Sequence, residues 1–310
     1  MVVPQPIPYQ GSKRNIAKRI LALFPHQFET LVEPFAGSAA VSLAAAAYGK
    51  ASKFYLNDLD KALMDLWKEI IENPQKISEE YEKLWNEQQG REKEFYFIVR
   101  DIFNETRRPD CFLYLLARCV KASIRYNSKG QFNQSPDNRR RGREPEKMRN
   151  DIFVASNLLR GRTIITSKDY REVLDIVSEG DLVYMDPPYQ GVCNSRDPRY
   201  YQTIDFGDFM SQIRKLVDRR VPFIISYDGR KGEKRYGKEI PSSLGVIRVE
   251  IRAGRSTQST LLGRNEVTYE SLYLSRELVD RLGVSPAEIS KQTQDLEPLQ
   301  LTLPIAGDSM

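Results

Sequence analysis

A short apolar run that ends in Asp-Pro-Pro-Tyr is the stretch of this sequence best suited to chemistry. The run spans residues 181–186, and Pro187, Pro188 and Tyr189 follow it directly. Its length and β-forming residues predict a buried strand, and neither proline has an N–H group with which to continue one. We therefore expect an acid, two rigid carbonyl groups and an aromatic ring just past the strand's carboxyl end, where open α/β sheets bind ligands.

These residues suit the activation of an exocyclic amine. The Asp186 carboxylate can accept one N–H of such an amine while the Pro187 carbonyl accepts the other. The two bonds localise the nitrogen lone pair, and the same acceptors stabilise the positive charge that develops when the amine attacks an electrophile. Tyr189 can stack on the flat ring that carries the amine. The alternative is structural: a rigid turn capped by Asp186, with Tyr189 packed at its rim.

The N-terminal part of the chain predicts a strand–turn–helix unit that could hold a nucleotide. Residues 9–15 suit a glycine-containing loop at a helix start, with Lys13 facing either solvent or a ligand carboxylate. Residues 30–35 predict a strand, and the small residues 36–40 predict a tight turn where a ligand can approach the backbone. Gly37 is the only glycine in this turn, so the stretch is not a dinucleotide fingerprint.

A second predicted strand, residues 53–58, ends in an acid 21 residues past Gly37. An acid about 20 residues past such a turn is placed to accept hydrogen bonds from the two hydroxyl groups of a ribose. Asp58 could equally cap the helix that begins at Leu59. Only its combination with the turn favours an adenosine-type ligand.

Residues 59–159 have an almost wholly helical pattern, which predicts a helical insertion between two halves of a sheet. Within it, residues 125–133 predict two short strands, and residues 138–143 are the densest basic cluster of a chain whose net charge is only +5. Arginine, asparagine and glutamine among aromatic residues suit phosphate contacts and base edges, although a basic run is often only a solvated loop. The predicted DNA-binding residues are Arg125, Tyr126, Asn127, Asn133, Arg139, Arg140, Arg141 and Arg143.

The remainder of the chain completes an α/β fold. Buried strands are predicted at residues 163–166 and 221–227, and residues 246–251 and 267–274 suit two closing strands paired antiparallel. Polar loops are expected at residues 190–206, 230–238 and 252–264. We divide the chain into an α/β domain (1–60 and 160–276) that carries the candidate catalytic residues, a helical insertion (61–159) and a flexible C-terminal extension (277–310).

The composition describes a soluble globular protein. Of 310 residues, 40% are hydrophobic, and no apolar run approaches the roughly 20 residues that a bilayer span needs. Residues 1–6 lack the layout of a signal peptide, so we expect a cytoplasmic protein of a prokaryotic or viral host cell. Three cysteines and one histidine form no pattern of metal ligands, so we expect no metal site.

In their order along the chain, these motifs resemble those of the Dam-like DNA N6-adenine methyltransferases, from Tyr9 to about Ser275. Two departures are visible: Ser38-Ala39-Ala40 stand where members often have a second glycine, and Tyr9 stands where many have tryptophan. The matching stretches are Tyr9-Gln10-Gly11-Ser12-Lys13, Glu33-Pro34-Phe35-Ala36-Gly37-Ser38, Asn57-Asp58, Arg125-Tyr126-Asn127 with Gln131-Phe132-Asn133, Asp186-Pro187-Pro188-Tyr189 and Tyr201-Gln202-Thr203.

The resemblance implies a Rossmann-like, S-adenosyl-L-methionine-dependent methyltransferase fold, with a mostly parallel twisted sheet, an antiparallel closing strand and a helical DNA-recognition insertion. It implies that Asp186, Pro187, Pro188 and Tyr189 are catalytic. It also implies a set of residues that bind S-adenosyl-L-methionine: Tyr9, Lys13, Glu33, Pro34, Phe35, Gly37, Ser38, Asn57, Asp58 and Asp186.

The function so implied is methyl transfer to the N6 amine of an adenine that has left the DNA duplex. The N4 amine of cytosine is chemically equivalent for the same acceptors and stays open. So do a catalytically inactive DNA-binding protein on this scaffold and the methylation of RNA or of a protein glutamine. The expected partner is double-stranded DNA, a separate restriction endonuclease is a candidate partner, and we expect a monomer or weak dimer without membrane contact.

Overall fold

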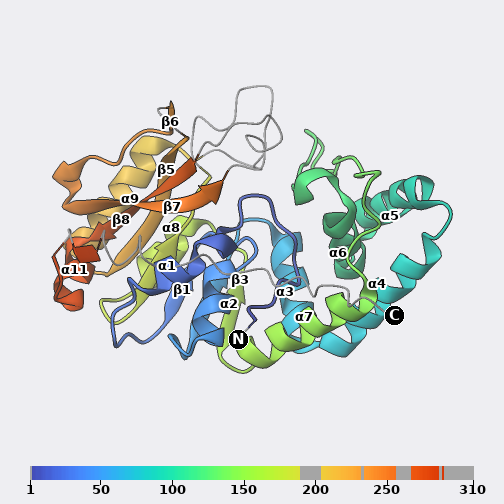
Figure 1. Ribbon diagram of the computed structural model, residues 1–310, viewed down its shortest axis with the longest axis horizontal. Coiled ribbons are helices and arrows are strands. Elements are labelled where there is room, and N and C mark those ends of the chain that lie inside the picture. The colour runs from blue at the N-terminus through green and yellow to red at the C-terminus, as the bar shows by residue number, and fades with distance from the viewer. Residues whose placement is uncertain (1, 189–203, 232–233, 256–266, 286–287, 290–310) are drawn as a thin grey trace, which may run out of the picture.

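A single open sheet runs through the part of the chain that the computed structural model describes, residues 2–188, 204–231, 234–255, 267–285 and 288–289. The strand order is β3-β2-β1-β4-β5-β8-β7, and β6 pairs with β5 beside this path (Figure 1). The strands are β1 (Leu31–Glu33), β2 (Phe54–Asn57), β3 (Thr163–Thr166), β4 (Leu182–Met185), β5 (Phe223–Lys231), β6 (Lys234–Tyr236), β7 (Val246–Arg255) and β8 (Val267–Ser275).

The first five strands of this order pair in parallel, whereas β8 is antiparallel to both β5 and β7. The predicted mostly parallel sheet with antiparallel closing strands is therefore confirmed. Every residue of β1, β2 and β4 is buried, as expected for central strands covered by helices on both faces.

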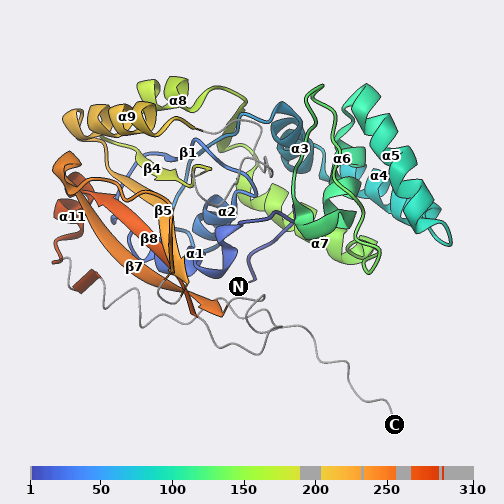
Figure 2. The ribbon, with the colours of Figure 1, turned by 90° about the horizontal axis from the view of Figure 1, so that it is seen from above.

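Helices cover both faces of the sheet (Figure 2). The short η1 (Lys13–Asn15) leads into α1 (Ala17–Leu21), which with α2 (Ala40–Ala47) covers one face, and α8 (Tyr170–Ile176) and α9 (Phe206–Asp218) cover the other. The side chains of β4 alternate accordingly: Leu182 and Tyr184 belong to the core on the α2 side, and Val183 and Met185 to the core on the α9 side.

Five helices occupy residues 61–159 and form the lobe at the right of Figure 1. Their bounds are α3 (Lys61–Glu72), α4 (Pro74–Glu87), α5 (Glu92–Thr106), α6 (Pro109–Arg118) and α7 (Pro145–Leu159), with the one-turn η2 (Val120–Ala122) after α6. Helix α3 begins where the Asp60 carboxylate accepts hydrogen bonds from the backbone N–H groups of Ala62 and Leu63, at 3.0 and 3.3 Å. It ends at Asn73, because Pro74 starts the next helix.

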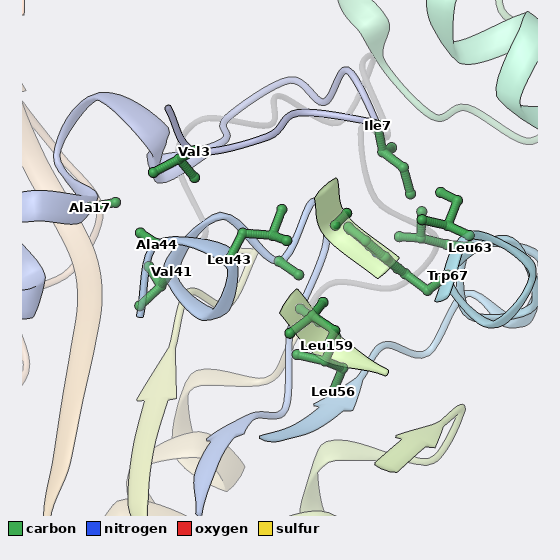
Figure 3. Close-up of a cluster of buried hydrophobic side chains, with 14 of the residues drawn as sticks. Val3, Ile7, Ala17, Val41, Leu43, Ala44, Leu56, Leu63, Trp67 and Leu159 are labelled. Atoms are coloured by element: carbon green, nitrogen blue, oxygen red, sulfur yellow. The ribbon is translucent and has the colours of Figure 1, made fainter. Parts of the chain in front are cut away.

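The helical lobe shares one hydrophobic core with the sheet. Figure 3 shows Leu63 and Trp67 of α3 together with Ile7, Leu56 of β2 and Leu159 of α7, and all five side chains are buried. Trp67 also donates its indole N–H to the Gly37 carbonyl oxygen at 2.9 Å. The lobe is therefore held against the catalytic half through α3 and α7.

Some sequence-based boundaries are wrong. The predicted basic loop at residues 230–238 contains the end of β5 and all of β6, and residues 252–255 belong to β7 rather than to a loop. Charged residues hid these strands, because their partners are distant in sequence: Arg230 on β5 pairs with Glu250 on β7 at 3.0 Å. The two short strands expected at residues 125–133 reduce to a turn with one antiparallel bridge, Tyr126–Phe132.

The predicted flexible extension begins as a packed helix. In α11 (Arg276–Leu282), Leu278 is fully buried and Val279 is 7% exposed. The Ser275 hydroxyl caps this helix by accepting from the Leu278 N–H at 3.2 Å, so the helix continues directly from β8. Among the described helices, none is both long and apolar enough to cross a membrane.

The Trp67–Gly37 bond predicts unequal effects of removing the two indole N–H groups of the protein. Trp67→Phe leaves the buried Gly37 carbonyl without this donor and should lower the free energy of unfolding by about 1–3 kcal/mol. Trp85→Phe is the matched control, because the buried Trp85 Nε1 has no hydrogen-bond partner among the described residues. Urea unfolding of both variants measures the difference, and equal losses would contradict the assignment.

Candidate active site

A cavity of about 500 Å³ opens at the carboxyl ends of β1, β2 and β4. Strand β1 lies between β2 and β4, so the sheet order reverses there, at the kind of switch point where open α/β sheets bind ligands. The walls of the cavity come from segments that are far apart in the sequence. These segments lie within residues 9–13, 33–41, 58–60, 122–126, 168–171, 186–188 and 204–208.

The turn after β1 is compressed against an aromatic ring. Gly37 has φ +49°, and a Cβ added to it would lie 3.1 Å from the Tyr9 ring. Glycine is therefore favoured here both by the backbone conformation and by the close approach of Tyr9. The Ser38 hydroxyl donates to the Ser12 hydroxyl at 2.9 Å, which ties the N-terminal loop to this turn.

Glu33, at the end of β1, stabilises the helix that follows the turn. Ala39, the N-cap residue of α2, has no side-chain hydrogen-bond acceptor, and the Glu33 carboxylate accepts from the Ser42 N–H at 2.7 Å instead. Burial raises the pKa of Glu33 to about 7, and the bond from Ser42 opposes the shift. Glu33 and Pro34 line the cavity, as does Phe35.

Asp58 lines the cavity at the end of β2 and also braces the turn. One carboxylate oxygen accepts from the Gly37 N–H and the other from the Asp60 N–H, both at 3.1 Å. Burial raises the pKa of Asp58 to about 6. Each oxygen keeps lone-pair capacity for a further donor, so the capping and ligand-binding interpretations of Asp58 are compatible.

Asn57 does not line the cavity, contrary to its predicted contact with the cofactor. Its side chain is fully buried and donates to the carbonyl oxygens of Pro34 and Lys168, both at 3.0 Å. Its amide oxygen accepts from the Lys168 N–H at 2.8 Å and from the Thr166 hydroxyl at 2.7 Å. Asn57 thus connects the ends of β1, β2 and β3, and its amide is saturated by protein groups.

Asp186 stands at the end of β4 in an ion pair. Lys13 Nζ lies 3.1 Å from Asp186 Oδ1 and 3.5 Å from Glu270 Oε2, a residue of β8 that the sequence did not single out. Burial raises the pKa of Asp186 to about 6; Lys13 opposes that shift and Glu270 adds to it. The only sequence signal for Glu270 is an acid inside a predicted closing strand.

Pro187 and Pro188 also line the cavity, directly after Asp186. Tyr189, Cys193 and the stretch 201–203 lie outside the described residues. No cluster of three or more potential metal-ligating side chains occurs among the described residues.

A further wall of the cavity escaped the sequence analysis. Residues 168–171, which follow β3, line the same cavity as the turn after β1. The Tyr170 ring packs on Phe35 with centroids 5.2 Å apart, and Asp169 caps α8 by accepting from the Arg171 N–H at 2.9 Å. An N-cap acid directly after a predicted strand was the available signal.

The predicted DNA-binding segment 125–133 borders this cavity through Tyr126. The Tyr126 hydroxyl donates to Asp60 Oδ2 at 2.8 Å. Asn127 shapes the turn itself, since its side-chain oxygen accepts from the N–H groups of Lys129 and Gln131 at 2.9 and 3.0 Å. Asn133 is exposed, and Arg125 is partly exposed.

The arginine cluster is exposed but partly neutralised. Arg139 and Arg140 both pair with Asp137, at 3.1 and 3.5 Å, and their side chains are 87% and 62% exposed. Arg141 pairs with Glu92 at 3.5 Å. Arg143 differs from these, because it pairs with the buried carboxylate of Asp151 on α7 and is held against the helical lobe.

Comparison with known proteins identifies the family. A family model described as "D12 class N6 adenine-specific DNA methyltransferase" matches residues 9–254. The chain is 28% identical to the Type II methyltransferase M1.LlaDCHI of Lactococcus lactis subsp. cremoris, over 58% of the chain and 64% of that protein. It is 27% identical to the Type II methyltransferase M.MjaIII of Methanocaldococcus jannaschii, over 70% and 82%. It is 24% identical to the DNA adenine methylase of Serratia marcescens, over 77% and 87%.

The coverage of these relatives varies. The aligned part spans less than two thirds of the lactococcal protein and 26% of the DNA N-6-adenine-methyltransferase of Escherichia phage P1. It spans most of the archaeal protein and of the Serratia protein.

The raised pKa of Glu33 predicts a pH-dependent stability. Because the folded protein holds this proton more tightly than the unfolded chain, the contribution is fully present below pH ~4 and is lost as the pH rises through about 7. Glu33→Gln should remove a decline on the order of 3 kcal/mol between these pH values. Urea unfolding from pH 4 to 8 measures it, with the exposed Glu105→Gln as control; an unchanged pH dependence in Glu33→Gln would refute the shift.

Proposed function

Because the chain belongs to the D12 class of N6 adenine-specific DNA methyltransferases, we propose that it binds S-adenosyl-L-methionine in the cavity and methylates the N6 amine of an adenine in double-stranded DNA. The observation that carries the proposal is that Asp186 and Pro187, the predicted amine acceptors, stand on the wall of the cavity that Gly37 and Asp58 also line. Amine activation and cofactor binding thus share one space.

The residues of the cavity fit this cofactor. Gly37 has no side chain, so a ligand can approach the turn beside the Tyr9 ring. Asp58, with a pKa of about 6, is ionised at neutral pH and can accept from ribose hydroxyl groups. Lys13 can pair with a carboxylate of the ligand. When bound, S-adenosyl-L-methionine supplies the electrophilic methyl group.

Apart from Asn57, the other residues predicted to contact the cofactor line the same cavity. Phe35, packed on Tyr170, offers a flat apolar surface to an aromatic ring of the ligand. Glu33 holds the start of α2 in place, so that the backbone of the turn is rigid before a ligand arrives. Tyr9, Pro34 and Ser38 complete the cofactor-facing lining.

The chemistry is positioning plus hydrogen-bond acceptance. With a pKa of about 6, Asp186 is mostly ionised at neutral pH and accepts one amine hydrogen, while the Pro187 carbonyl accepts the other. The amine nitrogen would receive the methyl group that the bound cofactor supplies, S-adenosyl-L-homocysteine would be the second product, and one amine proton would pass to solvent. The two acceptors stabilise the positive charge on the nitrogen.

The target adenine has to leave the duplex, because its amine is otherwise paired and stacked. Segment 122–126 forms part of the cavity rim and leads into the turn predicted to contact DNA. We assign DNA contacts to this turn and to the exposed arginines that follow it, and stacking on the target base to Tyr189. Arg143 is better suited to holding this segment in place than to contacting DNA, since its guanidinium group is paired with Asp151.

The alternative functions have less support, and each can be tested. Cytosine N4 would suit the same acceptors, but the matching family model and relatives such as the Serratia DNA adenine methylase favour adenine. An inactive scaffold is disfavoured because Asp186, Lys13 and Asp58 all stand at the cavity. The lactococcal and archaeal relatives named above are called Type II methyltransferases, which supports a separate restriction endonuclease as a partner. The state of assembly, monomer or weak dimer, remains a prediction.

The test of the proposed function is transfer of labelled methyl groups from S-adenosyl-L-methionine to mixed-sequence DNA. Asp186→Asn should lower turnover about 10²–10³-fold, because it removes the charge that stabilises the developing cation. Its affinity for DNA should stay nearly unchanged, since the duplex is held by other residues. Equal losses of binding and turnover would count against this role. Parallel reactions with RNA or with protein as the acceptor should incorporate no label, and incorporation there in place of DNA would contradict the proposal.

The exposed arginines predict a change in salt dependence. Combined substitution of Arg139, Arg140 and Arg141 by glutamine should weaken DNA binding and reduce the slope of log K against log salt by up to about 3. Lys50→Gln with Lys53→Gln is the control, because these exposed residues precede β2 at the opposite edge of the sheet. Fluorescence titrations between 50 and about 200 mM salt measure the slopes; an unchanged slope would place the cluster away from DNA.

A further inference from the structure

Lys13 lies between two carboxylates, and only one of them faces the reacting amine in the proposed reaction. We propose that Glu270 is a positioning residue. The Lys13 ammonium pairs with Glu270 in place of Asp186, so that the Asp186 carboxylate is released to bind the adenine amine. The inference rests on the proposed function and adds a residue of β8 to the site.

The geometry places both carboxylates within reach of one ammonium group. Lys13 Nζ is 3.1 Å from Asp186 and 3.5 Å from Glu270, and the side chains are 9%, 23% and 18% exposed respectively. Apart from this ion pair, Glu270 Oε2 is buried and has no hydrogen-bond partner among the described residues. Glu270 Oε2 can therefore accept a hydrogen bond from the Lys13 ammonium if the two groups move closer together.

The backbone of the closing strands brings Glu270 to this position. Glu270 pairs with Gly229 of β5. Between the pairs Ser226–Leu272 and Gly229–Glu270, two residues of β5 oppose one residue of β8, which is a β-bulge. A Cβ on Gly229 would lie 2.7 Å from the Tyr269 carbonyl oxygen, so only glycine permits this approach of β8. The position of Glu270 is therefore built into the sheet.

The need for a second acceptor follows from the chemistry of Asp186. In the ion pair, the positive charge of Lys13 lies 3.1 Å from Asp186 Oδ1, where it repels the positive charge that develops on the adenine amine at the same carboxylate. Moving this nearly buried ammonium away from Asp186 gives up one buried ion pair, which is unfavourable unless a second carboxylate lies within reach. Glu270 offsets that cost, because a small movement of the flexible lysine side chain exchanges one ion pair for another, and the other ammonium hydrogens stay available to a carboxylate of the ligand.

The charges around Asp186 fit this exchange. Among the described residues, the ionisable groups that interact with Asp186 or with its partners include Lys13 from η1, Glu33 from β1, Tyr184 from β4 and Glu270 from β8. With three carboxyl groups and one ammonium, the cluster carries excess negative charge when ionised. It therefore favours a cation at the position where the amine becomes positively charged.

The first experiment needs no activity. Urea unfolding is measured for Asp186→Asn, Glu270→Gln and the double variant of the protein without cofactor. Each single substitution leaves Lys13 one of these two carboxylates, whereas the double substitution removes both, so the double variant should lose more stability than the sum of the two single losses. Glu250→Gln, on neighbouring β7, is combined with Asp186→Asn as a control and should be additive. Additive losses for Glu270→Gln would overturn the proposal.

The second experiment follows single-turnover methyl transfer to DNA as a function of pH. Glu270→Gln should slow transfer at neutral pH by about tenfold, because Lys13 stays on Asp186. It should also move the acidic limb of the profile to lower pH, since removing a nearby negative charge lowers the pKa of Asp186.

The effect should depend on Lys13. In a Lys13→Met background, adding Glu270→Gln should change the rate by less than about twofold. An equally large effect without Lys13, or an unmoved acidic limb, would refute the positioning role. If the wild-type protein transferred no methyl group to DNA, the proposed function would fail, while the unfolding experiment would still decide whether Glu270 can replace Asp186 as the partner of Lys13.

Discussion

The ion pair between Lys13 and Asp186 is the interaction on which the architecture of the site depends. It joins the first loop of the chain to the end of β4, and Glu270 adds a contact from the last strand. Its strength comes from burial, because charges screened from water interact far more strongly than exposed ones. The N-terminal loop must be held in place for the pair to form, and the bond between Ser12 and Ser38 does this.

Acids at the ends of the parallel strands serve both folding and chemistry. Glu33 accepts from the first turn of α2, and Asp58 accepts from the turn after β1. Asp60 caps α3 and accepts from Tyr126. These bonds order the backbone before any ligand arrives, and the free lone pairs of the same carboxylates remain available. Burial raises the pKa of Glu33 and Asp58, so this preorganisation is tied to pH.

The helical lobe is integrated with the catalytic half rather than attached to it. Trp67 of α3 binds the turn after β1, and the Gln10 N–H donates to the Ala122 carbonyl oxygen at 3.0 Å. The Tyr126 hydroxyl reaches Asp60 at 2.8 Å. A nucleic acid held by the segment after Ala122 would therefore be fixed in position relative to the cavity, which positioning catalysis requires.

The sequence by itself determined the order of the central strands' motifs, the acid–proline–proline stretch after β4, the glycine turn and the acid after β2. These features are local: a buried strand, a proline that cannot extend it and a glycine at positive φ are each dictated by nearby residues. Family membership follows from their order, since the family model spans residues 9–254.

Only the tertiary structure decided which polar residues meet. Asn57 is saturated by three strand ends, Arg143 is held by Asp151, and Glu270 reaches Lys13, although 257 residues separate the last two along the chain. The wall at residues 168–171 and the strand character of residues 230–231 and 234–236 likewise depend on the folded sheet. The physical reason is that a charged side chain carries no local record of its partner: burial and strand register choose the partner, and both exist only once the chain has folded.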